Sequence, residues 1–262
     1  MDKTLRTAAS GLSAQQQYVE IISNNLANVN TTGFKKTRPE FQDLLYETLR
    51  PAGGNSRNGI EPMNEVQIGS GTQLSSTTKQ FAQGDIKETS NPLDIAINGE
   101  GFFIVKKPDN SYAYTRDGSF KTDKNGEIVT EQGYPLDPGF NIPQDAISIS
   151  ISRDGVVSAQ MDNTTDDMTL GQIELARFIN PAGLRNVGDN LYVETQSSGK
   201  AFFEQPGMNN TGELVQANLE ASNVDIVEEM VNMIIAQRAY EINSKSVQTA
   251  DTILSDAVNL KR

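Results

Sequence analysis

The stretch NVDIVEEMVNMIIAQRAYEINSKSVQTADTILSDAVNLKR, residues 223–262, contains neither Gly nor Pro, although the whole chain has 21 Gly and 10 Pro. Forty positions without a helix-breaking residue predict one long helix. Asn223 or Asp225 can cap its start with a side-chain oxygen. Acidic residues near the start and basic residues at the end suit the helix dipole: Glu228, Glu229, Lys261 and Arg262.

Apolar residues on this helix recur every seven positions and form a narrow stripe: Ile226, Met233, Tyr240, Val247 and Leu254, with Ala236, Ala250 and Ala257 three positions further on. At about 1.5 Å per residue the helix extends about 60 Å, which exceeds the diameter of a small domain. We therefore expect a second long helix to lie along the stripe.

The first thirty residues carry the same pattern: Leu5, Leu12, Val19 and Leu26, followed at three positions by Ala8, Ile22 and Val29, with Gln15 as the break. One such stripe alone favours an amphipathic helix docked on its own domain. Two matching stripes at opposite ends of the chain favour an antiparallel helical pair. The predicted fold class is α+β, with the terminal helices paired in a coiled-coil-like layer and a β-rich head inserted between them.

The predicted domain organisation follows from this pairing. Residues 1–30 and 223–262 form the helical domain, residues 31–90 and 205–222 form a connecting region, and residues 91–204 form the antiparallel β-rich head.

The connecting region begins where the first helix ends. There Gly33 can adopt the left-handed conformation of a helix C-terminal cap. Pro39 can open a short helix that buries four apolar residues: Phe41, Leu44, Leu45 and Leu49. Residues 51–59 have the composition of a loop, and residues 66–79 alternate polar with apolar residues as extended chain does.

The head contains many short runs typical of strands: Leu93–Ile97, Phe102–Val105, Tyr112–Tyr114, Ile147–Ile151 and Val156–Val157. Asn125-Gly126 is predicted to be a two-residue hairpin turn, and Asp154-Gly155 a second turn. Strands this short and this closely spaced favour an antiparallel sandwich or barrel-like domain over βαβ units.

The formal charge of −12 is concentrated in the middle of the chain. Residues 1–30 are neutral overall, and residues 223–262 carry four basic and six acidic residues, which leaves −10 for the middle. An acidic head argues against nucleic acid as a partner, because phosphate binding needs a basic patch. No apolar run approaches the length of a transmembrane helix and the N-terminus lacks the apolar segment of a cleaved signal peptide, so we expect no membrane insertion.

The sequence offers no catalytic, cofactor or metal site. It has no His, Cys or Trp, so the commonest general base and the thiolate chemistry are missing. Gly99-Glu100-Gly101 lacks the third glycine of a dinucleotide fingerprint. Asp123–Gly126 resembles the centre of a calcium loop, but Lys121 would be its first ligand, so a hairpin turn is favoured. Asp166-Asp167 lies in a polar stretch that favours a solvated loop. We therefore expect no enzyme and no cofactor.

Long motifs spread over the chain carry a family resemblance. SNNLANVNTTGFK at residues 23–35 and NMIIAQRAYEINSK at residues 232–245 resemble the terminal signatures of the bacterial flagellar rod and hook family. Three further motifs are similar to that family's head domain: AINGEGFF at 96–103, YTRDGSF at 114–120 and NLYVETQSSG at 190–199. The motif residues that we single out are Asn25, Asn28, Gly33, Phe34, Arg238 and Tyr240.

Within the family, FQDLLYETLR at residues 41–50 and QIGSG at residues 67–71 resemble the subunits of the distal rod more than those of the proximal rod or the hook. The chain departs from the family pattern at Asn55–Glu65. The resemblance implies a structural subunit, exported without a cleaved signal, that polymerises helically into the drive shaft crossing the periplasm and encloses an export channel.

The resemblance also implies the partners. They are further copies of the chain, the proximal rod proteins, hook or hook-junction subunits, the ring proteins of the outer membrane and peptidoglycan, the rod cap and the export apparatus. The terminal helices are expected to form the inner tube, with their stripes buried mainly between subunits through these residues: Leu5, Leu12, Val19, Ile22, Leu26, Ile226, Met233, Tyr240, Val247 and Leu254.

Two hypotheses go further. Residues 46–71 are an insert that braces neighbouring subunits and stiffens the shaft, with five residues singled out: Tyr46, Arg50, Gln67, Gly69 and Gly71. The acidic head faces a basic surface of the surrounding rings. Two alternatives stay open: a hook or proximal-rod subunit of the same family, and a secreted binding module or enzyme on a coiled-coil stalk, although the missing His and Cys weigh against catalysis.

Overall fold

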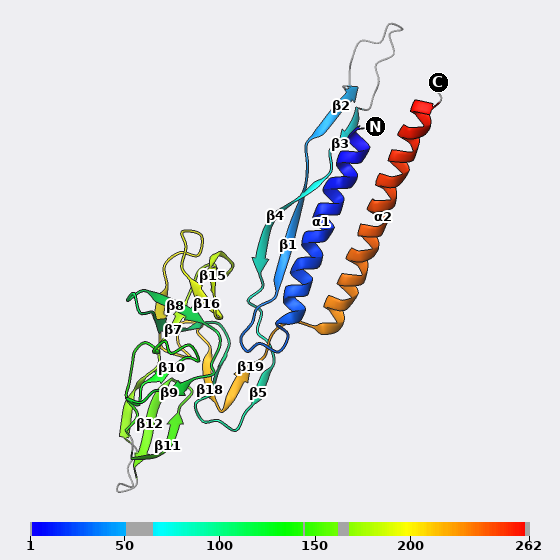
Figure 1. Cartoon of the computed structure of the whole chain (residues 1–262). Helices are drawn as coiled ribbons and strands as arrows, with labels where there is room; N and C mark the ends of the chain where they lie inside the picture. The colour runs from blue at the N-terminus through cyan, green and yellow to red at the C-terminus, as the bar shows by residue number, and fades with distance from the viewer. Residues whose placement is uncertain (1, 51–64, 144, 162–167, 260–262) are drawn as a thin grey trace. The chain divides into compact units, whose positions relative to one another are not determined.

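The structure, a computed structural model, describes residues 2–50, 65–143, 145–161 and 168–259. Long helices at the two ends enclose a β-rich antiparallel middle, so the predicted α+β class is confirmed (Figure 1). The chain forms two compact units: unit 1 comprises Met1–Ala27, Thr37–Thr78 and Asp225–Arg262, and unit 2 comprises Asn28–Lys36 and Lys79–Val224. The stretch that the sequence assigns to a connecting region is thus divided between the two units.

Some sequence-based expectations lie outside the described residues: the loop at 51–59, the stretch Asn55–Glu65 apart from Glu65, Asp166-Asp167, Lys261 and Arg262.

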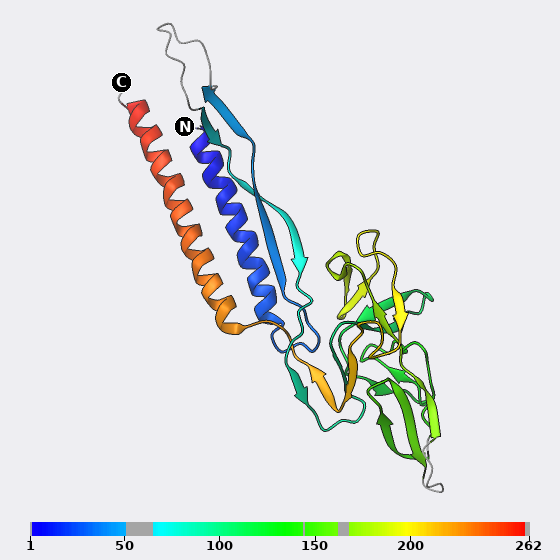
Figure 2. The same ribbon diagram turned by 180° about the vertical axis from the view of Figure 1, so that it is seen from behind.

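Unit 1 is organised by helices α1 (Asp2–Ala27) and α2 (Ile226–Asn259), which lie side by side and run in opposite directions (Figures 1 and 2). The predicted antiparallel helical pair is therefore confirmed. Asp225 is the residue that caps α2, because its Oδ1 accepts hydrogen bonds from the backbone N–H groups of Val227 (2.8 Å) and Glu228 (3.2 Å).

The helices approach closely where small residues face the partner. Ala8 on α1 and both Ala236 and Ala250 on α2 are buried. A Cβ at Gly11 would lie 2.9 Å from the side-chain nitrogen of Asn243, so only glycine fits there without displacing the asparagine. Small residues on the facing sides thus let the two helices approach closely.

The rest of the described part of unit 1 contains four strands: β1 (Thr37–Asp43), β2 (Tyr46–Arg50), β3 (Val66–Gly69) and β4 (Thr72–Lys79), the last of which ends at the first residue of unit 2. β1 pairs with β4, and β2 pairs antiparallel with β3. The extended chain predicted for residues 66–79 is confirmed.

The short helix predicted after Pro39 is wrong. That stretch is strand β1, and the apolar residues that the helix was expected to bury are largely open to solvent, with Leu45 89% exposed. The cause is pairing that local sequence does not reveal: β4, some thirty residues later, supplies hydrogen bonds to β1, such as that from the hydroxyl of Thr72 to the carbonyl of Gln42 (3.1 Å). A proline is tolerated because each strand of a two-stranded ribbon is an edge strand.

Unit 2 is β-rich, and its described strands pair antiparallel, as predicted. Six strands form one sheet in the order β15-β16-β8-β7-β14-β17, three form β11-β12-β13, and the pairs β18-β6, β19-β5 and β10-β9 complete the unit. The strands are β5 (Ile86–Glu88), β6 (Ile95–Asn98), β7 (Phe102–Lys106), β8 (Tyr112–Thr115), β9 (Lys121–Thr122), β10 (Ile128–Val129), β11 (Ala146–Ile151), β12 (Val156–Met161), β13 (Met168–Gln172), β14 (Leu175–Arg177), β15 (Arg185–Gly188), β16 (Leu191–Val193), β17 (Phe202–Glu204), β18 (Glu213–Gln216) and β19 (Asn218–Glu220), with a 3-10 turn at Pro181–Gly183.

Two apolar clusters fill unit 2. The larger includes Phe103, which is fully buried and meets Phe120 edge-on with ring centroids 5.0 Å apart. The smaller gathers Phe102, Tyr114 and Phe178 with neighbouring residues. Alternate residues of β7 therefore belong to different clusters, so this strand is buried on both sides.

The hairpin predicted at Asn125-Gly126 is present, but its loop is longer than two residues. The N–H of Gly126 donates to the carbonyl of Asp123 (2.8 Å), and the N–H of Asp123 donates to the carbonyl of Glu127 (2.9 Å). Gly126 has φ +81°, whereas Asn125 is not among the residues with positive φ. A two-residue type I′ turn needs positive φ at both central positions, so the loop has three residues and ends on the left-handed glycine.

Candidate functional site

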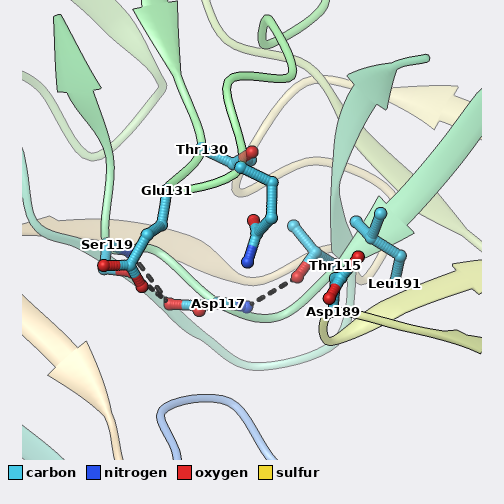
Figure 3. Close-up of a pocket in the computed structure, with 8 residues that line it drawn as sticks. Thr115, Asp117, Ser119, Thr130, Glu131, Asp189 and Leu191 are labelled. Carbon is cyan, nitrogen blue, oxygen red and sulfur yellow. Dashed lines mark hydrogen bonds between the residues drawn. The ribbon is translucent and has the colours of Figure 1, made fainter. Parts of the chain in front are cut away.

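A small polar pocket lies in unit 2, lined by Thr115, Asp117, Ser119, Thr130, Glu131, Gln132, Asp189 and Leu191 (Figure 3). Its volume of about 10 Å³ holds a single water at most. Asp117 Oδ1 already accepts hydrogen bonds from the backbone N–H (3.0 Å) and hydroxyl (2.7 Å) of Ser119 and from the hydroxyl of Thr32 (2.9 Å). The pocket is therefore part of a turn and offers no room for a substrate.

The predicted assembly residues occupy the facing sides of α1 and α2. Ile22 is buried, and seven others are half-buried: Leu5, Leu12, Val19, Leu26, Met233, Val247 and Leu254. Ile226 and Tyr240 remain 47% and 43% exposed. Pairing of the helices within one chain therefore covers much of the predicted stripe.

A second apolar stripe on α2 is exposed, and the sequence reasoning missed it. We call the following residues the outer stripe: Val227, Met230, Val231, Ile234, Ile235, Ile242 and Ile253. The sequence contains the signal for this stripe, because its residues also recur at helical spacings of three, four, seven and eleven.

A groove of about 410 Å³ lies beside the outer stripe within unit 1. It is lined by Thr4 of α1 and, from α2, by Ile242, Lys245, Ser246, Thr249, Ala250 and Ile253. The groove and the outer stripe share Ile242 and Ile253, so they form one continuous apolar surface.

The singled-out residues at 46–71 lie in or beside the β2–β3 ribbon. Tyr46 pairs with Gly69, where an added Cβ would lie 3.3 Å from the tyrosine ring, and the exposed Gln67 pairs with Thr48. Arg50 pairs through its backbone with Val66. Gly71 has φ +117°, and an added Cβ would lie 2.1 Å from the hydroxyl of Ser10, so this glycine lets the chain approach α1.

Asn25 joins three elements of unit 1. Its Nδ2 donates to the carbonyl of Thr37 (2.9 Å) and to Oε2 of Glu229 (3.1 Å), and its Oδ1 accepts from the N–H of Thr37 (3.0 Å). Both Asn25 and Glu229 are buried. The motif asparagine therefore ties the end of α1 to β1 and to the first turns of α2.

Gly33 has φ +64°, as expected, but it does not cap α1, which ends six residues earlier at Ala27. Its N–H donates to the carbonyl of Glu220 (2.8 Å), and an added Cβ would lie 2.6 Å from the carbonyl carbon of Arg116. Phe34 is buried, with Nζ of Lys79 4.9 Å from its ring centroid. Asn28 accepts a hydrogen bond from the hydroxyl of Thr31 (3.1 Å).

A buried group of charges surrounds this turn. Nζ of Lys35 donates to Oε1 of Glu220 (2.5 Å) and to the carbonyl of Ala82 (2.8 Å). Nε of Arg116 lies 3.2 Å from the other carboxylate oxygen of Glu220, and its two terminal nitrogens donate to the carbonyls of Gly101 and Gly99 (2.8 Å each). The three side chains are 0%, 4% and 1% exposed for Lys35, Arg116 and Glu220.

Burial dominates the electrostatics of this group. Loss of water lowers the pKa of Lys35, against the opposing attraction of Glu220, and also lowers the pKa of Arg116. Burial alone lowers the pKa of Lys79. The carboxylate of Glu220, held between two cations, compensates charges that would otherwise be costly to bury.

Asn223 completes the group, which explains why it does not cap α2. Its Oδ1 accepts from the N–H of Lys36 (2.7 Å), and its Nδ2 donates to the carbonyls of Gln80 (2.8 Å) and Ala82 (3.0 Å). The sequence marks Asn223 only as a possible helix cap. It does not reveal that Lys35, Arg116 and Glu220 are buried together, because nothing local shows which charged residues will meet in the fold.

Comparison with known proteins identifies the family of this chain. Residues 5–35 match the family model of the flagella basal body rod protein, residues 96–159 that of the flagellar hook protein FlgE/F/G D1 domain, and residues 215–260 that of the flagellar basal body rod FlgEFG protein C-terminal region. The flagellar basal-body rod protein FlgG of Borreliella burgdorferi is 52% identical over the full length of both chains. The chain belongs to the flagellar basal-body rod protein family.

Two further relatives carry the same name. FlgG of Caulobacter vibrioides is 48% identical over 99% of both chains, and FlgG of Bacillus subtilis is 41% identical over the full length of both. The matched regions contain the elements described above: α1 with Gly33 and Lys35, the strand that leads to Arg116, and the segment from Glu220 through α2. Arg238 and Tyr240 lie on α2, where Arg238 pairs with Glu241 (3.1 Å).

No helix in the described part of the chain is long and apolar enough to cross a membrane.

Proposed function

We propose that this protein is the structural subunit of the distal rod of the bacterial flagellar basal body, which polymerises helically through its terminal helices. Its relatives form the rod that spans the periplasm. The observation that carries the proposal is the outer stripe, because a water-exposed helix face of seven large apolar residues calls for a partner. A second copy of the chain is that partner, since a contact that does not close on itself generates a helical polymer.

Both sets of apolar residues contribute to the proposed inner tube. The inner stripe, which contains the residues predicted from the sequence, holds α1 against α2 within one chain. The outer stripe and the adjoining groove of about 410 Å³ then receive helices of neighbouring copies. Torque passes from motor to hook through these contacts, and the tube that they form encloses the export channel.

A charge placed in the outer stripe tests this arrangement. Ile235→Asp puts a carboxylate on α2 at a position that is 58% exposed in the single chain. We expect a folded monomer that fails to polymerise, as measured by sedimentation and electron microscopy. Ile147→Asp is the matched control, because Ile147 lies on β11 and is 65% exposed. Normal polymers from Ile235→Asp would refute the proposed contact.

The β2–β3 ribbon is proposed to stiffen the polymer. Its apolar residues are open to solvent in the single chain: Leu45, Tyr46, Leu49, Val66 and Ile68. Contact of these residues with a neighbouring subunit would resist bending of the shaft. Removal of residues 46–71 should then give polymers that bend as a hook does. A straight polymer of ordinary stiffness from the deleted chain would rule the idea out.

The remaining partners follow from the position of the rod. Proximal rod proteins and hook-junction subunits are proposed at its two ends, and the rod cap and export apparatus during growth. The −10 charge of the middle region favours a basic surface on the ring proteins that surround the rod. Such an association weakens as salt rises from about 0.05 to 0.5 M, since screening acts on exposed charges. Salt-independent binding of the rings would exclude it.

We infer no catalytic activity. A stalked binding module is the alternative from a different class, and it predicts a stable small oligomer with helices already covered. Limited proteolysis separates the two, because α2 of an assembling subunit becomes resistant to protease only in the polymer. A hook or proximal-rod subunit is the nearer alternative, and the bend and length of the polymer distinguish it.

A further inference from the structure

The chain passes between the two units at four points, and three of these border one region of unit 2. These three crossing points lie directly after Lys36, directly before Lys79 and directly after Val224, all of which belong to unit 2. On the unit 2 side they are continued by residues 33–36, 79–85 and 218–224, which we call the linking segments. These segments are far apart in sequence, so side chains must hold them together in space.

Lys35 and Glu220 each bond to linking segments other than their own. Lys35, from the first, donates to the carbonyl of Ala82 in the second (2.8 Å) and to Glu220 in the third (2.5 Å). Oε1 of Glu220 also accepts from the N–H of Gly84 in the second segment (3.0 Å). One ion pair therefore joins all three segments.

Asn223, a neutral residue, also bonds to the two linking segments other than its own. From the third segment it accepts from the N–H of Lys36 (2.7 Å) in the first and donates to the carbonyls of Gln80 and Ala82 in the second (2.8 and 3.0 Å). Backbone bonds run between the same segments: Gly33 N–H to the carbonyl of Glu220, Gln80 N–H to that of Lys36, and Ala221 N–H to that of Asp85.

Arg116 attaches this arrangement to the sheet region. Its guanidinium donates to the carbonyls of Gly99 and Gly101 while its Nε faces Glu220. If the third segment moves away, Glu220 leaves with it and two buried cations lose their carboxylate. If the first segment moves away, Glu220 loses Lys35. Each partial opening leaves a buried charged group without its partner. An unpaired buried charge has a high free-energy cost, so partly open states are disfavoured.

A well-packed apolar cluster would stabilise this region at least as well as buried charge does. An apolar cluster, however, would still close if any two of the segments met. A carboxylate shared by two cations and a backbone N–H favours only the state in which every member is present. The chemistry therefore suits cooperativity better than it suits stability.

We propose that Lys35, Arg116, Glu220 and Asn223 form a lock that makes the three linking segments open and close as a single element. The lock concerns one chain and goes beyond the proposed function in the rod. Through it, the chain that leaves α1 and the chain that enters α2 become ordered together, even though more than 180 residues separate them in the sequence.

Hydrogen–deuterium exchange on the full-length monomer tests the lock. In Glu220→Gln we expect exchange to rise by about tenfold or more in all three peptides, covering 28–36, 79–88 and 213–224, because their opening is shared. Exchange in β7 and β12 should stay as slow as in the parent chain. Glu131→Gln is the matched control, because Glu131 pairs with Lys121 at 3.2 Å where both side chains are exposed.

Asn223→Ala is the second variant, because it removes hydrogen bonds without leaving a buried charge. It should raise exchange in the same three peptides by about threefold or more and leave β7 unchanged. The proposal is overturned if faster exchange is confined to residues 213–224. It is also overturned if Asn223→Ala speeds exchange in β7 and β12 as much as in the linking segments, since unit 2 would then open as a whole. Should Glu220→Gln unfold unit 2, Asn223→Ala decides between these outcomes.

Discussion

The two units differ in what one chain can cover by itself. Unit 2 buries large side chains in two clusters, with Phe103, Ile104 and Leu175 almost inaccessible. Among the described residues of unit 1, the buried apolar side chains are Ala8, Ala14, Ile22, Ala236 and Ala250, four of them alanine. The larger apolar residues of the outer stripe on α2 face solvent instead. Unit 2 is therefore complete within one chain, whereas unit 1 still presents the surface that a neighbour needs.

This difference shows how one sequence can encode both a stable subunit and a polymer. Burial of large apolar groups supplies most of the favourable free energy of folding, and unit 2 obtains it from its own residues. Alanine contacts hold α1 and α2 close together but contribute less per residue. The outer stripe keeps its apolar area available for association, so the stability of the polymer and that of the single chain are set by different residues.

The largest expected effect comes from truncating one apolar side chain in each unit. Phe103→Ala should lower the free energy of unfolding of unit 2 by about 3–5 kcal/mol, because it leaves a cavity in a closed core. Ile235→Ala should change monomer stability by less than about 0.5 kcal/mol, since that side chain is already 58% exposed. Urea unfolding followed by circular dichroism measures both.

For polymer formation the expected order is reversed, and Ile235→Ala has the larger effect of the two variants. Ile235→Ala should raise the concentration needed for polymer formation, whereas a folded fraction of Phe103→Ala should assemble normally. Equal losses of monomer stability in the two variants would contradict the contrast between the units.

A backbone effect of intermediate size is expected at the turn that follows α1. Gly33→Ala should destabilise unit 2 by more than about 2 kcal/mol, because the left-handed conformation costs a non-glycine residue about 1–2 kcal/mol and the Cβ would also collide with Arg116. Gly133→Ala isolates the first contribution, since Gly133 has φ +86° and no atom within 4 Å of an added Cβ. If thermal unfolding finds the two variants equally destabilised, the close approach to Arg116 is not a constraint.

The helices and strands that the sequence predicts best are those marked by a regular spacing of apolar residues. The seven-residue spacing from Met233 to Leu254 identified α2 and its partner, and the absence of Gly and Pro gave its length. Alternation of Ile147, Ile149 and Ile151 located β11 in the same way. Such periods depend on local geometry, which a single segment carries in full.

The failures occurred where distant segments decide the structure. Phe41 belongs to a strand because β4 pairs with that stretch, and no local pattern from Pro39 onward contains this information. The lock joins residues 35, 116 and 220, so its members look like ordinary surface charges in sequence. Gly33 was correctly expected to be left-handed, but its reason is the close approach of Arg116 and not the end of α1.

A smaller effect is expected where hydrogen bonds, and not apolar burial, hold unit 1 together. Asn25→Ala removes two donated bonds and one accepted bond and leaves the buried carboxylate of Glu229 without this donor. We expect a loss of about 1–3 kcal/mol in the unfolding of the helical unit. Ser23→Ala, an exposed position two residues earlier on α1, is the control. Hydrogen exchange at the end of α1 reports the change, and an Asn25→Ala variant as protected as Ser23→Ala would show that these bonds do not hold the helices.

The smallest expected effect is a loss of stability of unit 2 at alkaline pH. Burial, with a contribution from Glu194, raises the pKa of Tyr114 to about 12, and burial also raises the pKa of Tyr192. Between pH 10 and 12 the unfolded chain therefore loses the Tyr114 proton while folded unit 2 keeps it, so stability falls as pH rises, by about 1.4 kcal/mol per pH unit for one group. The lowered pKa of Lys35 acts with the opposite sign below 10.5, the ordinary pKa of a lysine, because there the unfolded chain binds more protons. Comparing the parent with Tyr114→Phe at each pH cancels the lysine contribution, because both chains contain Lys35. The urea midpoint of unit 2 should then fall less steeply above pH 10 in Tyr114→Phe than in the parent. Parallel curves for the two chains would mean that this hydroxyl is not shielded from solvent, and that unit 2 is less completely closed than its core suggests.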